Sequence, residues 1–420
     1  MKVYLRTFGC RANHYDSETV RAMIEEAGHA VVPDAADADV AVFNSCAVTA
    51  DAEADLRQAV RRAARQQPGL RSIVMGCAAG RPAAPNVSEI AALPTVQHVL
   101  PGAELETIAA VLELPPAMVR LRAARQTGAR ALLRVQDGCD EHCTFCATTL
   151  ARGASRSRSP DELVAEAERL ADAHPEIVIT GIHIGSYGAD IGSSLGQLLE
   201  ALVHRVRDVR FRLSSLEATE VDSRLADLLT SAPGRVAPHL HAPLQSGSDR
   251  LLKRMGRHWY TAASYAAAID SLARRARVFG LGADIITGFP GETEDDHRAT
   301  VALVERLPFT YLHVFPFSAR PGTAAERLGG GVRSDVAHRR AAELRDVARR
   351  KADAHITSRV GGEADVVVVR SGHGAAEGVG EALTEDYLSV LPADAVLPRR
   401  TRYQARLERR GKELIGVRVG

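Results

Sequence analysis

The amino-acid sequence predicts an α/β protein in three parts, and two observations support this fold class. Short β-rich runs alternate with helical patterns from residue 1 to about residue 356, which indicates parallel sheets covered by helices. The pattern then changes to strand-like runs separated by glycines, which is typical of a small all-β module. A chain of 420 residues is long enough for two or three domains. We therefore expect domains at residues 1–115, 128–356 and 357–420.

The first part is predicted to be a small parallel α/β domain. Three β-rich runs extend from Val3 to Thr7, from Asp39 to Phe43 and from Ser72 to Met75. Acidic and hydroxyl residues suit the N-terminus of a helix, so the residues Asp16-Ser17-Glu18 predict a helix start there and a helix end before Gly28. Strands that alternate with helices in this way favour a parallel sheet.

The central part is predicted to be an incomplete barrel. Eight strand–helix units close a full (β/α)8 barrel, so six units predict a (β/α)6 arrangement. A long helical run after the glycines at 329–331 ends near Ile356. The six expected strands lie around residues 132–135, 177–180, 210–214, 239–241, 283–287 and 311–315.

The last part is predicted to be a small antiparallel β-barrel. Strand-like runs lie at residues 366–369, 387–390 and 415–419, with glycines between them that suit turns. Barrels of this kind often bind oligonucleotides.

Composition and charge limit the class of protein. Apolar residues make up 45% and charged residues 25%, as in ordinary globular proteins. No apolar run is long enough for a membrane span, and the N-terminus has no secretion signal, so we expect a cytoplasmic protein without a membrane partner. A net charge of +1 and an aromatic content of 4% mean that any nucleic-acid site must come from local basic clusters.

Three cysteines form a Cys-x3-Cys-x2-Cys motif directly after the first expected barrel strand. They are Cys139, Cys143 and Cys146. A four-iron cluster usually takes four thiolates, so three leave one iron open to a cofactor or substrate. The alternative is a zinc site with His142 as fourth ligand, but His142 is adjacent to Cys143, which makes joint ligation of one ion awkward.

The other three cysteines each end a β-rich run. Cys10, Cys46 and Cys77 follow the three expected strands of the first part. Carboxyl ends of adjacent parallel strands meet at one edge of a sheet, so these cysteines are expected to form a second metal site. The alternative is three buried structural cysteines, which are common in proteins.

On these motifs the chain resembles the methylthiotransferases of the radical S-adenosylmethionine class over nearly its whole length. The segment from Thr7 to Asn13 with Asp16-Ser17-Glu18 looks like the opening motif of that family, and 44–49 and 75–77 look like its second and third ligand motifs. The triad at Cys139 matches its radical cluster, and the last module looks like its RNA-binding TRAM domain. The sequence departs from the family at Ala147-Thr148-Thr149-Leu150, where an apolar pair and a proline are often found.

The resemblance implies the cofactors and the reaction. It implies two [4Fe-4S] clusters, one on each cysteine triad, and S-adenosyl-L-methionine, and the clusters rather than side chains would carry the chemistry. The S-adenosylmethionine pocket would include Gly181, Glu217, Gln245 and Ser246. The product would be a methylthio group on carbon 2 of N6-threonylcarbamoyladenosine at position 37 of tRNA. Isopentenyladenosine of tRNA and an aspartate of a ribosomal protein are other substrates within the family.

Partners follow from the same resemblance and from the basic residues. A reducing protein such as flavodoxin or ferredoxin would donate electrons to a monomeric enzyme. RNA phosphates would be held by arginines after the radical motif and in the last module, although solvated surface charge is the usual fate of such runs. These arginines are Arg152, Arg156, Arg158, Arg400 and Arg402. A hypothesis of a different class is a non-catalytic iron–sulfur or zinc protein that binds RNA.

Overall fold

The computed structural model describes residues 1–47, 50–80, 85–102, 104–116, 124–371, 380–394 and 397–419. The chain separates into two compact units. The first contains residues 1–126, 136–156 and 318–327, and the second contains 127–135, 157–317 and 328–420. Both cysteine motifs therefore belong to the first unit. The domain boundaries expected at 115, 128 and 356 stay predictions, since the units are not continuous along the chain.

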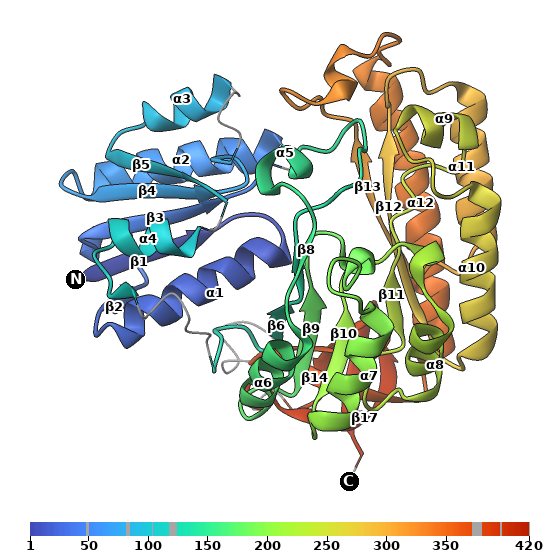
Figure 1. Ribbon diagram of the computed structural model, residues 1–420. Coiled ribbons are helices and arrows are strands. Elements are labelled where there is room, and N and C mark those ends of the chain that lie inside the picture. The colour runs from blue at the N-terminus through green and yellow to red at the C-terminus, as the bar shows by residue number, and fades with distance from the viewer. Residues whose placement is uncertain are drawn as a thin grey trace. The chain divides into compact units, whose positions relative to one another are not determined.

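A parallel sheet forms the centre of the first unit (Figure 1), as the sequence predicts, and it has five strands where the sequence indicated three. Its order is β2-β1-β3-β4-β5, and each neighbouring pair is parallel. The strands are β1 (Lys2–Thr7), β2 (Ala30–Val32), β3 (Val40–Ser45), β4 (Arg71–Gly76) and β5 (Val96–Pro101).

Helices cover both faces of this sheet. In β3, Val40 and Val42 pack with α1 (Arg11–Glu26) and α4 (Leu105–Val111), whereas Ala41 and Phe43 pack with α2 (Ala50–Gln66) and α3 (Pro85–Ala91). Successive side chains of a strand point to opposite faces, so a strand that is apolar throughout requires a layer on each side.

Helix α1 begins earlier than the sequence predicted. Its N-cap is Cys10, and Asp16, Ser17 and Glu18 lie inside the helix. Asp16 and Ser17 are not free to cap a helix, because Asp16 pairs with Arg152 and the Ser17 hydroxyl bonds to Thr7 and Asn44. Long-range contacts therefore explain these polar residues better than a local capping preference does.

Six parallel strands of the second unit confirm the incomplete barrel. Parallel pairs form β10-β9-β6 and β11-β12-β13, and isolated parallel bridges join the β10 segment to the β11 segment. The strands are β6 (Ala131–Arg134), β9 (Glu176–Thr180), β10 (Arg210–Leu213), β11 (His239–His241), β12 (Gly280–Thr287) and β13 (Tyr311–Pro316). The helices of this unit are α6 (Pro160–Ala171), α7 (Leu195–Arg205), α8 (Ser223–Ser231), α9 (Asp249–Arg254), α10 (Ala262–Arg275), α11 (Glu294–Arg306) and α12 (Ser334–Arg359).

Side chains of these strands alternate between an apolar and a polar face. Leu240 of β11, Ala283 of β12 and Val314 of β13 belong to the hydrophobic core packed on the helices. The residues between them, including His241 and Asp284, lie on the opposite face of each strand. This inner face of the strands carries the polar groups discussed below.

The last module is a closed barrel with the order β14-β15-β16-β18-β17. Its strands are β14 (Glu363–Arg370), β15 (Glu381–Leu383), β16 (Ser389–Pro392), β17 (Arg402–Arg410) and β18 (Glu413–Arg418). The expectation of an antiparallel barrel holds for four pairings, but β16 and β18 are parallel. Closure pairs strands that are distant in sequence, and the local pattern did not reveal this exception.

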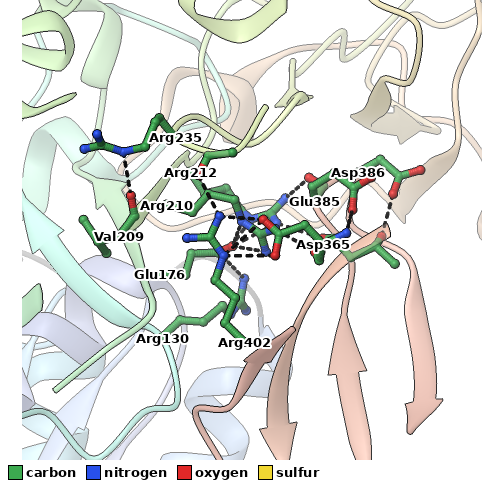
Figure 2. A network of polar contacts seen from close by, with 12 residues as sticks. Arg130, Glu176, Val209, Arg210, Arg212, Arg235, Asp365, Glu385, Asp386 and Arg402 are labelled. Carbon is green, nitrogen blue, oxygen red and sulfur yellow. Dashed lines mark hydrogen bonds and ion pairs between the residues drawn. The ribbon is translucent and has the colours of Figure 1, made fainter. Parts of the chain in front are cut away.

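A buried ion network joins this barrel to the parallel strands (Figure 2). Glu176 accepts hydrogen bonds from Arg210 Nε at 2.7 Å and Arg212 Nε at 2.8 Å. The same arginines donate to carbonyl oxygens of Asp365 and Thr384 in the barrel. Burial raises the pKa of Glu176, but the guanidinium groups of Arg212, Arg210 and Arg130 outweigh it and hold that pKa well below its usual range.

None of the helices in the described residues is both long and apolar enough for a membrane span.

Candidate metal centres and cofactor site

Cys10, Cys46 and Cys77 lie at the carboxyl ends of three neighbouring strands, as the sequence predicts. Cys10 follows β1, Cys46 follows β3 and Cys77 follows β4, and the pairing register of Ser45 with Gly76 aligns the last two strand ends. Cys46 and Cys77 are buried, whereas Cys10 is exposed. Their thiols are close enough for the Cys77 pKa to respond to the charge of both others. The edge of the sheet thus gathers three soft sulfur donors around one point.

The backbone at Gly9 lies very close to the side chain of Cys46. Gly9 has a φ of +90°, and a Cβ added there would lie 2.5 Å from Cys46 Sγ. Only glycine fits this close approach without strain. The side chain of Asn13 donates to the carbonyl oxygens of Phe8 and Ser45, at 2.9 and 2.7 Å, and so holds the loops before Gly9 and Cys46.

The spacing of the sulfur atoms can be compared with the spacing that a zinc ion or a cluster requires. Within the described residues, neither cysteine triad has its three sulfur atoms within 4.8 Å of one another. A tetrahedral zinc ion with Zn–S bonds of about 2.3 Å would hold them roughly 3.8 Å apart. In a four-iron cluster each thiolate binds a different iron, which requires a wider spacing. Neither triad is therefore arranged as a closed zinc site, and both spacings are compatible with a cluster.

Arg152 is buried beside Cys77. Its Nε lies 3.3 Å from Cys77 Sγ, and its Nη2 donates to Asn13 at 2.7 Å and to Asp16 at 2.8 Å. Its Nη1 donates to Asp137 at 3.0 Å. Burial raises the pKa of the Cys77 thiol to about 11, although Arg152 acts in the opposite direction.

This placement corrects the expected role of Arg152. The sequence suggested a contact with RNA phosphate, but the side chain is 1% exposed and each of its three nitrogen atoms already has a protein partner. A phosphate has no access to it. Arg152 instead connects α5 (Thr148–Arg152), which follows the Cys-x3-Cys-x2-Cys motif, with the cysteine triad at the sheet edge.

The loop that carries Cys139, Cys143 and Cys146 is stabilised by main-chain contacts. The Cys139 amide donates to Gly153 O at 3.0 Å, and the Cys146 amide donates to Cys143 O at 3.1 Å. The Thr148 amide lies 3.4 Å from Cys146 Sγ, a contact that would stabilise a thiolate. All three cysteines are partly exposed, while His142 is exposed and forms no close ligand group with them in the described part of the chain. The geometry does not favour the zinc alternative.

The four expected S-adenosylmethionine contacts all follow barrel strands in the second unit. Gly181 directly follows β9. Glu217 is buried and paired with Arg257, and its Oε2 is buried without a hydrogen-bond partner in the described residues. Gln245 has a φ of +63°, which is a strained conformation for a side chain of this kind and is typical of ligand sites. The Ser246 hydroxyl contacts Thr300 Oγ1 and accepts from the Ser248 amide, so it also supports the loop.

Of the other arginines that the sequence suggested as RNA contacts, one is exposed and three donate hydrogen bonds to protein groups. Arg156 is exposed, as an RNA contact requires. Arg158 donates to Glu166 at 2.7 Å, and Arg400 donates to the carbonyl of Gly128 at 3.2 Å. Arg402 donates from Nε to Asp365 at 2.9 Å and from Nη2 to Gly234 O at 2.6 Å, so its charge is used inside the protein. The structure does not favour Arg402 as an RNA contact.

Sequence reasoning missed residues that shape the sheet edge. Asn13, Asp16 and Asn44 lie in the motifs that carried the resemblance, but no role was inferred for their side chains. Asn44 Nδ2 donates to Asn13 O at 2.7 Å and to Ser17 Oγ at 3.0 Å. A polar residue in an otherwise apolar buried strand is the signal that would have found Asn44. Val48 and Thr49 of the same motif lie outside the described residues.

Two family models match the chain. Residues 2–99 match the uncharacterized protein family UPF0004, and residues 133–304 match the radical SAM superfamily. A solved structure of the radical S-adenosylmethionine methyltransferase TsrM from Kitasatospora setae, with cobalamin and a [4Fe-4S] cluster bound, gives a TM-score of 0.58 at 16% identity and covers 77% of this chain and 76% of that chain. This likeness supports the fold alone.

Curated relatives match most of the chain. The threonylcarbamoyladenosine tRNA methylthiotransferase MtaB of Thermotoga maritima is 37% identical over 345 residues, which is 79% of this chain and 78% of that protein. The protein of the same name from Bacillus subtilis is 36% identical over 362 residues, or 81% and 79% of the two chains. The tRNA-2-methylthio-N(6)-dimethylallyladenosine synthase of Corynebacterium efficiens is 34% identical over 348 residues, or 76% and 66%.

Proposed function

Because the chain belongs to the radical S-adenosylmethionine methylthiotransferase family, we propose that it adds a methylthio group to carbon 2 of N6-threonylcarbamoyladenosine at position 37 of tRNA. The observation that carries this proposal is the presence of two cysteine triads in one compact unit. A radical enzyme needs one open cluster, and sulfur transfer gives a reason for a second. The relatives that carry the threonylcarbamoyladenosine name support the choice of substrate.

The superfamily uses S-adenosylmethionine and a [4Fe-4S] cluster. Cys139, Cys143 and Cys146 would bind three irons of that cluster and leave the fourth for the cofactor. When bound, cluster and cofactor supply a radical that activates an inert carbon–hydrogen bond, which no amino-acid side chain does. The Thr148 amide, 3.4 Å from Cys146 Sγ, would stabilise the ligating thiolate.

The pocket residues would hold the polar groups of S-adenosylmethionine. Glu217 Oε2 is buried without a hydrogen-bond partner in the described residues, and such a group gains most from a ligand donor. Gly181 would allow close approach of the cofactor, and Gln245 would present its amide from a strained backbone. Ser246 would contribute through a loop that its hydroxyl also stabilises.

A second [4Fe-4S] cluster on Cys10, Cys46 and Cys77 is part of the proposal. Gly9 would let the ligand Cys46 lie close to the backbone, and Arg152 would donate a hydrogen bond to the Cys77 sulfur and so compensate part of its negative charge. We further propose a monomeric, cytoplasmic enzyme that takes electrons from a flavodoxin or ferredoxin and contacts tRNA through Arg156 and exposed arginines of the last barrel.

The experiment that tests the function uses anaerobically reconstituted full-length protein. We expect about eight iron atoms per chain, release of deoxyadenosine with S-adenosylmethionine and reductant, and the methylthio product on tRNA that carries threonylcarbamoyladenosine, measured by mass spectrometry. Cys77→Ala should keep about half of the iron and still release deoxyadenosine, but form no methylthio product. Cys143→Ala should release no deoxyadenosine.

Other outcomes would replace the proposal. Product only on tRNA with isopentenyladenosine, or only on a ribosomal-protein aspartate, would assign another substrate. Protein that binds tRNA and zinc but never cleaves S-adenosylmethionine would be a non-catalytic RNA-binding protein.

A further inference from the structure

A second group of ligand-type side chains lies on the inner face of the strands in the second unit. His241 of β11, Asp284 of β12 and His313 of β13 come from three adjacent parallel strands. Their ligand atoms all lie within 4.8 Å of one another. The three residues lie in one compact unit and share no residue with the cysteine triads.

We propose that His241, Asp284 and His313 bind one divalent transition-metal ion through two imidazole nitrogens and one carboxylate oxygen. Two histidines and one carboxylate are the ligands of many catalytic zinc sites and of non-haem iron sites. Three protein ligands leave coordination positions for water or for an oxygen atom of a substrate.

The distances fit such an ion. His241 Nε2 lies 3.1 Å from Asp284 Oδ1, and His313 Nδ1 lies 3.2 Å from the same oxygen. Ligand atoms about 2.05 Å from a metal are separated by roughly 2.9 Å at octahedral angles and roughly 3.4 Å at tetrahedral angles. Both observed distances lie between these limits, so small shifts of the side chains would admit the ion.

Contacts behind His241 orient its ring. The Tyr311 hydroxyl lies 3.1 Å from His241 Nδ1 and 2.9 Å from His239 Nε2. Histidines that bind metals usually use their other ring nitrogen for such a bond, which fixes the tautomer and the ring position. Gly282 makes room for this arrangement, because a Cβ there would lie 2.0 Å from the Tyr311 ring. His241 Nε2 is thereby directed at Asp284.

The group is open on the His313 side. The His241 side chain is 7% exposed, that of Asp284 is 27% exposed and that of His313 is 55% exposed. His241 is thus a buried ligand held by a hydrogen bond, and His313 is an accessible one. This combination suits a metal site at which bound water can be replaced by a substrate oxygen. The alternative is a metal-free arrangement in which Asp284 accepts hydrogen bonds from both histidines, and the experiment must distinguish the two.

The test measures zinc on the holoenzyme independently of activity. Protein that carries its clusters is first separated from weakly bound metal. It is then equilibrated with micromolar zinc and analysed for zinc and iron by mass spectrometry. We expect one zinc per chain in the wild type, and at least tenfold weaker zinc binding in His241→Ala and His313→Ala with unchanged iron. His313 is exposed, so its variant is expected to fold.

Two controls make the result specific. His183→Ala should retain zinc, because His183 pairs with Glu220, at 2.7 Å, in a histidine–carboxylate pair of similar geometry and is not part of the group at His241, Asp284 and His313. X-ray absorption at the zinc edge should show nitrogen and oxygen neighbours at about 2.0–2.2 Å. Equal zinc in wild type and His313→Ala, or a sulfur shell at about 2.3 Å that indicates zinc on the cysteines, would overturn the proposal.

Discussion

A single glycine beside the cysteines, Gly9, allows the close packing at the carboxyl edge of the five-stranded sheet. Gly9 and Gly28 both have positive φ, at +90° and +77°, but only Gly9 has neighbours that an added Cβ would meet. Backbone strain is therefore common to both positions, and steric conflict with Cys46 is specific to Gly9.

Gly9→Ala is expected to prevent loading of the second cluster. The new methyl group would overlap Cys46 Sγ, so the reconstituted protein should lose about half of its iron. Gly28→Ala should lower stability by about 1–2 kcal/mol and retain its iron. Iron analysis and thermal melting measure both effects. Equal iron in the two variants would contradict the steric argument.

Arg152→Ala is expected to destabilise the first unit strongly. Removal of the guanidinium leaves Asp16, whose side chain is 1% exposed, without its cation, and breaking a buried pair costs about 3–5 kcal/mol. Arg156→Ala, at an exposed position, should change stability by no more than about 0.5 kcal/mol. Urea unfolding of the two variants measures the difference. A small effect of Arg152→Ala would mean that Asp16 finds another partner.

At the scale of elements, the contact between the last barrel and the parallel strands depends on buried charge. Glu176→Gln keeps the size of the side chain but removes the negative charge between Arg210 and Arg212, which are both fully buried. We expect a loss of about 3 kcal/mol. Glu200→Gln, in an exposed pair with Arg224, should cost less than about 1 kcal/mol. Denaturation midpoints for both variants provide the measurement, and similar midpoints would argue against the network.

Asp386 gives the contact between the last barrel and α12 a dependence on pH, because its carboxylate bonds to His355 and Arg359. Burial raises its pKa, but hydrogen bonds from His355 and Thr384 and the charge of Arg359 lower it to about 2. A depressed folded pKa stabilises the protein fully above the unfolded pKa near 3.9 and less as the pH falls toward 2. The stability difference between wild type and Asp386→Asn should thus shrink as the pH falls from about 5 toward 2. Asp353→Asn, which changes an exposed carboxylate, should show no such trend in thermal melts.

The elements were more predictable than their side-chain partners. The six barrel strands and the strands before each cysteine follow from short strand-like runs that alternate with helical patterns, and the structure contains all of them. The roles of Arg152 and Arg402 could not be predicted in this way, because their partners Asp16 and Asp365 lie 136 and 37 residues away. A basic residue has the same local signature whether it faces solvent or a buried carboxylate. The parallel pairing of β16 with β18 is a non-local property of the same kind.

At the scale of the whole molecule, a net charge of +1 means that tRNA must be held by local patches rather than by the overall field. Three of the exposed basic residues of β17 and of the turn after it provide one such patch: Arg406, Arg410 and Lys412. Arg409 is also exposed, but it pairs with Asp353. Arg402, at the start of the same strand, is excluded from the patch by its bonds to Asp365.

Replacement of Arg406, Arg410 and Lys412 by alanine is expected to weaken tRNA binding and its salt dependence together. Each lost phosphate contact lowers the slope of log K against log salt by about 0.7–0.9, so three contacts should lower it by about 2–3. A matched control replaces Arg298, Arg306 and Arg349 by alanine. These arginines are exposed on helices of the second unit, and their replacement removes the same charge. Filter binding at several salt concentrations separates the two. If the control weakened binding equally, long-range charge rather than the barrel patch would hold the tRNA.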